Sequence, residues 1–250
     1  MDLHLQDKIV MITGSSQGIG LAIARGLHEE GCRIVLHGRN KEKLRTVAQQ
    51  MGDVEYLLGD VTDPDECFRL SEEIRERFGH LDGLVCNVGS GSSVPPGLES
   101  YSEWQRVFDI NLFSTTNMIE SCRSLLAAKQ GTVVCISSIC GHELLGAPLT
   151  YSAAKAALNH YIRGIARPLA LDGVRINGIS PGNILCEDGV WERKLEENKG
   201  AVEAILQRDV ALQRLGTGKE IADSTAFLLS SCSDFATGAI FVMDGGQLRS

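Results

Sequence analysis

The chain has 250 residues but no long apolar run, no block of basic residues and no C-x-x-C pair. A transmembrane helix needs about 18 or more consecutive apolar residues, and no stretch approaches that length. The net charge of −8 and the missing basic block disfavour nucleic acid and anionic membranes as partners. The first residues, MDLHLQDK, have neither the basic start nor the apolar core of a signal peptide, which favours a cytosolic location.

The eight cysteines are scattered along the chain rather than paired. Several stand in apolar runs such as LVCNV and VVCIS, which is typical of buried reduced thiols. Ligand pairs at the spacing that zinc sites use are missing. No metal site is therefore predicted.

The sequence does contain a regular alternation of apolar, β-branched runs and helical patterns. The predicted strands cover residues 8–13, 33–37, 54–58, 81–86, 132–137, 175–180 and 239–243, and the predicted helices 18–30, 40–51, 64–78, 102–128, 151–171 and 218–230. The strand runs are continuous rather than alternating, which is typical of a parallel sheet covered on both faces. We therefore predict a single-domain Rossmann fold over residues 1–250, a doubly wound α/β fold with a seven-stranded parallel sheet and helices on both faces.

Two segments interrupt this rhythm. Residues 89–100, GSGSSVPPGLES, are rich in Gly, Ser and Pro and predict a loop. Residues 182–216 are charged and mostly helical in pattern. Because long excursions at the strand ends of an open α/β sheet usually cover the ligand crevice, we expect residues 182–216 to form a substrate lid.

The segment TGSSQGIG, residues 13–20, follows the first predicted strand and opens a helix. Gly14 allows a tight turn, Gly18 lets the backbone approach a pyrophosphate, and Gly20 lets the helix pack close to the sheet. A plain glycine turn is the alternative, but the strand–loop–helix setting favours a dinucleotide-binding loop. The predicted cofactor contacts of this loop are Gly14, Ser16, Gln17, Gly18, Ile19 and Gly20.

Arg39 follows the second predicted strand, where NAD-binding folds usually have an acidic residue. A carboxylate there repels a 2′-phosphate and an arginine pairs with it, so Arg39 favours NADP over NAD; an exposed loop arginine is the alternative. Asp60 and Val61 follow the third strand and are predicted to contact the adenine. The alternative for Asp60 is a helix cap, a role better suited to Asp63 before Pro64.

With these motifs the chain resembles the short-chain dehydrogenase/reductase family across essentially its full length. The gap of 13 residues from Ser138 to Tyr151 matches that family, whereas Val88 in CNVGS stands where the family has alanine. The matching residues are Asn87, Gly89, Asn111, Ser138, Tyr151, Lys155, Asn177, Pro181 and Gly182.

The resemblance implies hydride exchange between a nicotinamide and a carbonyl or secondary alcohol. It makes Tyr151 the general acid and base, Ser138 the donor to the reacting oxygen, and Asn111 the anchor of a water that links Lys155 to solvent. Tyr151 and Lys155 are four residues apart, on one face of a helix. Because an ammonium beside a phenol favours the phenolate, Lys155 is expected to lower the Tyr151 pKa from its usual value of about 10, and also to hold the nicotinamide ribose.

The resemblance also assigns the remaining cofactor contacts, which are Asn87, Gly89, Tyr151, Lys155, Pro181, Gly182 and Ile184. Cys186 stands where the family often has a threonine that bonds the nicotinamide carboxamide, which leaves the backbone of Ile184 to hold that amide. Cys186 is expected to be an apolar filler rather than a redox group. Pro168 falls late in the helix predicted over 151–171 and predicts a kink or an early end there.

The substrate stays open between a 3-oxoacyl thioester on a carrier protein and a small ketone or alcohol. His142 follows Ser138 and is predicted either to contact substrate or to be an exposed loop residue. The resemblance implies a homotetramer, or a dimer. A catalytically silent NAD(P)-binding regulatory or scaffold protein is the alternative function, and it is disfavoured because none of the four catalytic positions is broken.

Overall fold

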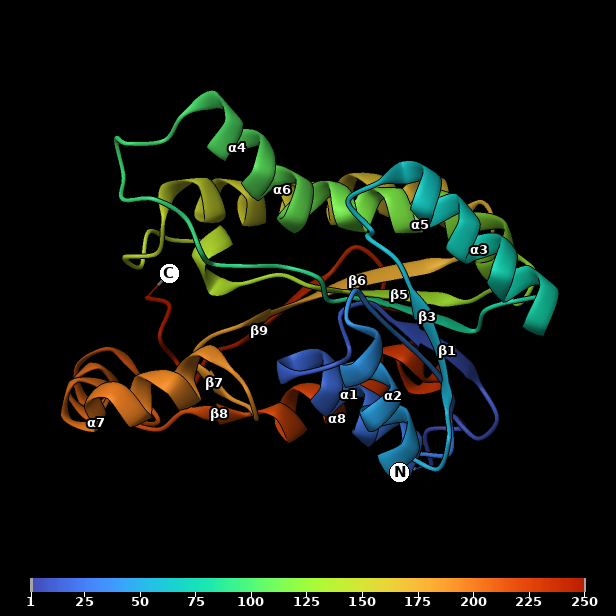
Figure 1. Ribbon diagram of the computed structural model, residues 1–250, viewed down its shortest axis with the longest axis horizontal. Helices are drawn as coiled ribbons and strands as arrows, with labels where there is room; N and C mark the ends of the chain where they lie inside the picture. The colour runs from blue at the N-terminus through green and yellow to red at the C-terminus, as the bar shows by residue number, and fades with distance from the viewer. Residues whose placement is uncertain (1, 250) are drawn as a thin grey trace.

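Seven strands form one sheet between two layers of helices in the computed structural model, which describes residues 2–249 (Figure 1). The strands are β1 (Ile9–Ile12), β2 (Arg33–Gly38), β3 (Glu55–Leu58), β4 (Gly83–Cys86), β5 (Thr132–Ile136), β6 (Arg175–Pro181) and β9 (Ile240–Met243). They lie in the order β3-β2-β1-β4-β5-β6-β9, and every neighbouring pair is parallel. The prediction of a doubly wound, seven-stranded parallel sheet is confirmed.

The strand order reverses at β1, which pairs with β2 on one side and with β4 on the other. Ile12 in β1 stands opposite Leu36 in β2 and Val85 in β4. The loops that leave the carboxyl ends of β1 and β4 therefore meet. Open α/β sheets bind their ligands at such a switch point.

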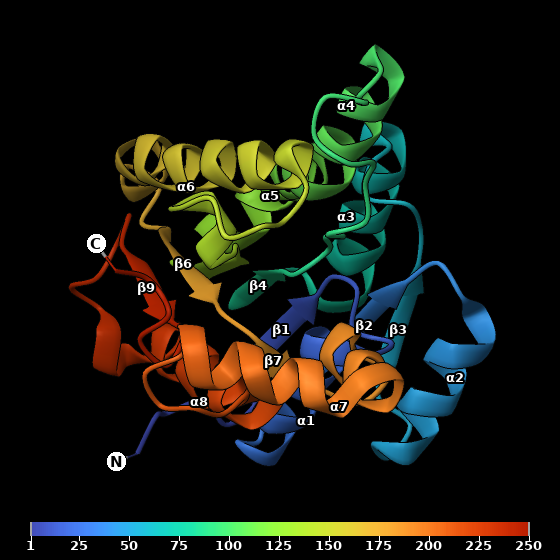
Figure 2. The same ribbon diagram turned by 90° about the vertical axis from the view of Figure 1, so that its left-hand side faces the viewer.

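Helices cover both faces of the sheet, as the two perpendicular views show (Figures 1 and 2). They are α1 (Gly18–Glu29), α2 (Lys41–Gln50), α3 (Pro64–Phe78), α4 (Tyr101–Phe108), α5 (Ser114–Ala127), α6 (Leu149–Ala170), α7 (Val190–Asp209) and α8 (Gly218–Leu229). Val10 and Ile12 pack with α1, α2 and α8, whereas Ile9 and Met11 pack with α3, α5 and α6. The alternation of side chains along β1 thus divides the apolar residues between two cores.

The helix predicted over 102–128 is an unbroken helical run over 101–127, but a π-helical turn, η1 (Asp109–Phe113), lies inside it between α4 and α5, and the sequence did not predict this turn. The side-chain amide of Asn111 donates to the Val107 carbonyl at 3.0 Å. In an α-helix that carbonyl would accept the backbone N–H of residue 111, so the side chain competes for it and favours the wider turn. Asn111 is fully buried as a result.

Helix α6 continues through Pro168 to Ala170, so the predicted early end is wrong. Only Leu169 and Ala170 follow the proline within the helix, and the lost backbone hydrogen bond is therefore confined to the last turn. Arg123 on α5 donates to the Pro168 carbonyl at 3.3 Å and pairs with Asp172 at 2.6 Å. These contacts fasten the end of α6 to α5.

The expected lid, residues 182–216, contains α7 and part of a small second sheet that the sequence did not predict. β7 (Ile184–Leu185) pairs in parallel with β8 (Gly216–Thr217), which joins the two ends of the lid. Asn198 has non-helical backbone angles inside α7, where two helical pieces meet. Among the residues that the structure describes, no helix has the length and apolar character needed to cross a membrane.

Candidate active site

Buried polar groups fasten α6 to the end of β5. The ammonium of Lys155 donates to the Ile136 carbonyl at 2.9 Å. The Ser137 hydroxyl donates to Asn159 Oδ1 at 2.6 Å. Of the two neighbouring serines, Ser137 is thus engaged in packing the helix against the sheet, which leaves Ser138 as the one available to a reacting group.

Tyr151 and Ser138 bring two hydroxyl groups together. Ser138 accepts the Cys140 N–H at 3.1 Å and so caps the short turn η2 (Ile139–Gly141). Burial raises the pKa of Tyr151 to about 12, although a side-chain hydrogen bond with Ser138 acts in the opposite direction. The phenol is therefore protonated at neutral pH, as a proton donor must be.

Lys155 lies one helical turn from Tyr151, with its ammonium nitrogen 6.0 Å from the centroid of the tyrosine ring. Burial lowers the Lys155 pKa to about 8. Desolvation has the largest effect on the Tyr151 pKa and raises it, so the predicted lowering by Lys155 does not appear in the net shift and stays a prediction.

Asn111 and Lys155 meet at Gly89. A Cβ on Gly89 would lie 3.0 Å from Asn111 Oδ1 and 3.2 Å from Lys155 Nζ. Asn111 accepts the Ser90 N–H at 2.9 Å and donates to the Ser90 carbonyl at 3.0 Å, so it holds the start of loop 89–100. The structure thus places Asn111 beside Lys155, and its role as a water anchor stays a prediction.

The β1–α1 loop has the shape that a dinucleotide phosphate requires. Gly14 and Gly18 have φ angles of 65° and 61°, in the left-handed region that favours glycine. A Cβ on Gly18 would meet no atom within 4 Å, so this side of the loop is open. Helix α1 begins there after Gln17, with no side-chain cap and no acidic residue in its first turn. Its N-terminal amides and positive dipole end therefore fit an anion such as the pyrophosphate of a dinucleotide.

Asn87 holds this loop from the β4 side. Its side-chain amide donates to the carbonyl oxygens of Thr13 and Gly14, each at 3.1 Å. A Cβ on Gly20 would come within 2.5 Å of Asn87 Nδ2, so α1 can approach Asn87 closely only with glycine at this position. Asn87 therefore shapes the loop, and its direct contact with a cofactor stays a prediction.

The other predicted loop residues lie around the same turn. Ser16 Oγ is 3.5 Å from the position of a Cβ on Gly38, at the end of β2. The Lys43 ammonium on α2 donates to Gln17 Oε1 at 2.8 Å. Ile19 packs against the core under α1 and α8. Ser16 and Gln17 thus lie toward β2 and α2, whereas Ile19 is turned to the core.

Arg39 follows β2 with 74% of its side chain exposed, and its Nη1 lies 3.4 Å from Asp60 Oδ2. Such an exposed pair is weak. Burial raises the Asp60 pKa, but hydrogen bonds from Thr62 and the nearby Arg39 charge outweigh it and lower the pKa overall. Val61 is buried beside Asp60. Asp63, and not Asp60, caps α3, so the helix-cap alternative for Asp60 is wrong.

The lid touches the glycine loop directly. The Gly18 N–H donates to the Glu187 carbonyl at 3.1 Å, and the Glu187 carboxylate pairs with Arg25 on α1 at 2.9 Å. Asp188 lies 3.5 Å from the Lys43 ammonium. The backbone hydrogen bond therefore holds the lid against the loop, and the two ion pairs hold it against α1 and α2.

The predicted residues at the start of the lid are near the ends of β6 and β9. Pro181 ends β6, the Gly182 N–H donates to the Met243 carbonyl at 2.9 Å, and Ile184 is buried in β7. Cys186 belongs to the core under α1 and α8, and burial raises its pKa to about 11. A buried, protonated thiol is what an apolar filler requires.

His142 lies on the exposed loop before α6, with Nε2 3.0 Å from Ser180 Oγ. Partial burial and the Arg163 charge lower its pKa, while Asp244 and Glu143 raise it by less. The loop position matches one of the two predictions for His142; contact with a substrate stays a prediction.

Two residues at this end of the sheet were missed by sequence reasoning. Asn159 fastens α6 through Ser137, and its signal was a polar residue on the buried face of a helix. His37 is 1% exposed at the end of β2 and contacts the glycine loop. Its signal was a histidine within an apolar strand, two residues before the predicted Arg39.

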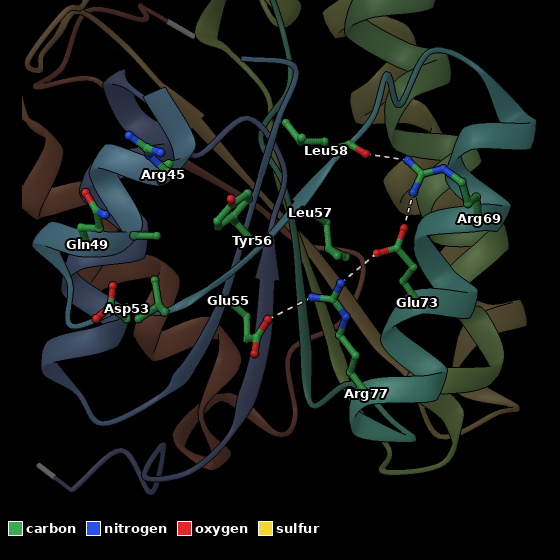
Figure 3. A pocket seen from close by; sticks show the side chains of 12 residues that line it. Arg45, Gln49, Asp53, Glu55, Tyr56, Leu57, Leu58, Arg69, Glu73 and Arg77 are labelled. Atoms are coloured by element: carbon green, nitrogen blue, oxygen red, sulfur yellow. Dashed lines mark hydrogen bonds and ion pairs between the residues drawn. The ribbon is translucent and has the colours of Figure 1, made fainter. Parts of the chain in front are cut away.

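A cavity of about 600 Å³ opens along the outer edge of β3, between α2 and α3 (Figure 3). Arg77 pairs there with Glu55 at 2.9 Å and with Glu73 at 3.1 Å. Arg69 also pairs with Glu73 and donates to the Leu58 carbonyl at 2.5 Å. No predicted site residue lines this cavity, and four of its charged side chains, Arg69, Arg77, Glu55 and Glu73, are paired with one another.

Comparison with known proteins agrees with this geometry. A family model described as Enoyl-(Acyl carrier protein) reductase matches residues 14–247. Glucose 1-dehydrogenase of Gluconobacter oxydans (strain 621H) is 31% identical over 252 residues, which cover 96% of this chain and 91% of that protein. An uncharacterised oxidoreductase of Staphylococcus aureus (strain MW2) is 37% identical over 183 residues, 72% of this chain and 79% of that protein. Among solved structures, L-sorbose reductase from Gluconobacter frateurii, complexed with NADPH and L-sorbose, aligns over 100% of both chains with a TM-score of 0.93 and 29% identity.

Proposed function

The chain belongs to the short-chain dehydrogenase/reductase family, and we propose that it is an NADP-preferring oxidoreductase that interconverts a ketone and a secondary alcohol. The observation that carries the proposal is the meeting of the Tyr151 and Ser138 hydroxyls close to the buried Lys155, at the carboxyl end of the sheet. The catalytically silent alternative would not need these groups to converge.

Two hydroxyl groups act on the reacting oxygen. In reduction, Tyr151 donates its proton to that oxygen as negative charge develops there, and Ser138 donates a hydrogen bond to the same atom. In oxidation, Tyr151 accepts the proton of the alcohol. Because burial raises the Tyr151 pKa to about 12, the phenol holds its proton at neutral pH and can give it to the developing alkoxide.

A bound nicotinamide cofactor supplies the hydride for reduction and accepts it in oxidation. Lys155 would hold the nicotinamide ribose, and the backbone of Ile184 would hold the carboxamide. Gly14 and Gly18 would let the loop backbone meet the pyrophosphate. Asn111, beside Lys155, would anchor a water through which the ammonium exchanges protons with solvent.

Arg39 supports NADP over NAD. Its guanidinium is exposed and only weakly paired with Asp60, so it is free to turn to a 2′-phosphate. The similar L-sorbose reductase was crystallised with NADPH. Asp60 and Val61 would then meet the adenine.

For the substrate we propose a small ketone or alcohol. Two similar proteins are named for small sugars, glucose and L-sorbose. A 3-oxoacyl thioester on an acidic carrier protein fits less well, because the chain carries a net charge of −8.

A homo-oligomer, either a homotetramer or a dimer, is part of the proposal. Phe235, just before the edge strand β9, is fully exposed, and Val242 on β9 is 43% exposed. Burying such side chains against a second copy is favourable. The cytosolic location stays a prediction.

A spectrophotometric panel tests the function. L-Sorbose, simple cyclic and aliphatic ketones and acetoacetyl thioester would be offered with NADPH and with NADH. We expect turnover of at least one ketone with NADPH, and loss of turnover in Tyr151→Phe with NADPH binding retained. Full activity of Tyr151→Phe would contradict the assignment of the acid, and equal use of NADH would contradict the cofactor preference.

A further inference from the structure

The imidazole of His37 lies between two segments that the cofactor site needs. Nδ1 accepts the Gly14 N–H at 3.3 Å, and Nε2 lies 3.2 Å from the Gly59 carbonyl. Gly14 is the first glycine of the nucleotide loop, and Gly59 directly precedes Asp60. The ring is 1% exposed, so water does not replace either partner.

These two partners determine where the ring carries its proton. The Gly14 amide is a donor, so Nδ1 must be the unprotonated acceptor. The Gly59 carbonyl is an acceptor, so Nε2 must carry the hydrogen. A second proton on Nδ1 would point at the Gly14 N–H and break that contact. The geometry therefore requires the neutral, Nε2-protonated tautomer.

The backbone of the same residue is tied to the loop as well. The His37 N–H donates to Ser15 Oγ at 2.9 Å, and the His37 carbonyl accepts the Ser15 N–H at 2.9 Å. On the far side, Arg69 from the β3-edge cavity donates to the Leu58 carbonyl at 2.5 Å (Figure 3). The end of β3 is thus held from two directions, by Arg69 at residue 58 and by His37 at residue 59.

We propose that His37 is a positioning residue for dinucleotide binding, which holds the glycine loop at Gly14 and the end of β3 at Gly59 in a fixed relation. This inference rests on the proposed function, since it concerns the same cofactor site. His37 itself touches no reacting atom. It acts by keeping the phosphate-binding loop and the adenine-binding end of β3 at the separation that one cofactor spans.

Three charged groups face the ring from the segments around it. Asp60 favours the protonated ring, whereas Arg69 and Arg39 disfavour it. Burial acts more strongly than any of them and lowers the His37 pKa to about 4. The ring therefore keeps the neutral form over the range in which the enzyme would bind its cofactor.

The contacts of His37 with Gly14 and with Gly59 can be tested separately, by substitutions that keep a polar atom at the position of only one ring nitrogen. Asn places its oxygen where Nδ1 stands, Gln places its amide nitrogen near Nε2, and Phe keeps the ring volume with neither. We expect His37→Phe to weaken NADP⁺ binding about tenfold or more, as measured by calorimetry, because two buried partners lose their hydrogen bonds. His37→Asn and His37→Gln should fall between Phe and wild type. His28→Gln, an exposed histidine on α1, is the control and should bind NADP⁺ as wild type does.

A second readout needs no cofactor. The ¹⁵N shifts of the His37 ring in the ligand-free protein should report the Nε2-protonated neutral tautomer from pH 8 down to about pH 5. A ring protonated at Nδ1 in that range, or a folded His37→Phe that binds NADP⁺ within twofold of wild type, would overturn the proposal. If His37→Phe does not fold, the proposal is tested by the ring tautomer and by the NADP⁺ affinities of His37→Asn and His37→Gln. Failure of the wild type to bind NADP⁺ would overturn the proposed function instead, and the tautomer measurement would still test the hydrogen bonds.

Discussion

The ammonium nitrogen of Lys155 lies 6.0 Å from the centre of the Tyr151 ring and is hydrogen-bonded to the Ile136 carbonyl at 2.9 Å. The amine therefore joins the catalytic helix to the sheet as well as standing near the phenol. Lys155 is buried and Tyr151 is partly buried, and desolvation favours the neutral form of each: it raises the Tyr151 pKa to about 12 and lowers the Lys155 pKa to about 8.

The first prediction concerns the ionisation of Tyr151. A raised pKa means that the neutral phenol persists below about pH 12, so Tyr151 of the ligand-free protein should not ionise at the usual pKa of tyrosine. The ultraviolet difference spectrum between wild type and Tyr151→Phe, followed from pH 7 upward, isolates this one phenol. A phenolate signal from Tyr151 near pH 9 in the ligand-free protein would contradict the prediction.

The second prediction separates the neighbouring serines. Ser138→Ala should lower kcat on any substrate that the wild type turns over by about 100-fold or more, because the reacting oxygen loses a donor. Ser137→Ala should lose about 1–3 kcal/mol of unfolding free energy, because Asn159 Oδ1 is left buried without its donor, and keep most of its kcat. Urea unfolding and steady-state kinetics on both variants check this. The reverse pattern would identify Ser137 as the catalytic serine.

The third prediction concerns the 2′-phosphate. Arg39→Ala should weaken NADPH binding about tenfold and leave NADH binding unchanged, since only NADPH has the phosphate that Arg39 would pair with. Fluorescence titration with each cofactor measures this. Arg45→Ala is a matched control, because Arg45 lies on the adjacent helix α2 in an exposed pair with Glu42 at 3.6 Å. Equal losses of NADPH and NADH affinity in Arg39→Ala would exclude a phosphate contact.

The fourth prediction distinguishes two glycines of one loop. Gly20→Ala should destabilise the fold, because its Cβ would come within 2.5 Å of Asn87 Nδ2. The Cβ of Gly18→Ala would meet no atom within 4 Å. The loss of unfolding free energy is therefore limited to about 1–2 kcal/mol, from the strain of a left-handed backbone conformation. Its methyl group should nevertheless obstruct the phosphates and abolish NADPH binding. Thermal unfolding and cofactor titration check the pair, and tight NADPH binding by Gly18→Ala would place the phosphates elsewhere.

The fifth prediction is an acid dependence of stability. The His37 pKa falls from 6.5 to about 4 on folding, so the folded chain binds fewer protons at this site than the unfolded chain. The stability gained from the neutral ring is present above pH 6.5 and is lost as the pH falls toward 4. Urea midpoints of wild type and His37→Gln between these limits isolate that component. If the urea midpoints of the two proteins change with pH in parallel, His37 is not buried as the neutral form.

Most of the strands could be predicted because they are apolar runs, although β6 (RINGISP) also contains Arg175, Asn177 and Ser180. The glycine loop could be predicted because three glycines follow the first strand. The π-helical turn at Asn111 could not, since it depends on a side chain taking the Val107 carbonyl from the backbone. The raised pKa of Tyr151 could not be predicted from the sequence either. The spacing of Tyr151 and Lys155 places them on one helix face, but burial, which decides the ionisation, is a property of the whole fold.

The charged side chains at the β3 edge limit how this molecule can assemble. Arg69 occupies the Leu58 carbonyl, and the ion pair of Arg77 and Glu55 lies at the same edge, which disfavours the addition of another strand to that side of the sheet. The other edge strand of the sheet, β9, is the remaining place where a strand of a second copy can pair. A molecule with one available sheet edge can pair that edge with the same edge of a second copy across a twofold axis. The pair then has no available edge left, so extended fibres cannot form through this sheet.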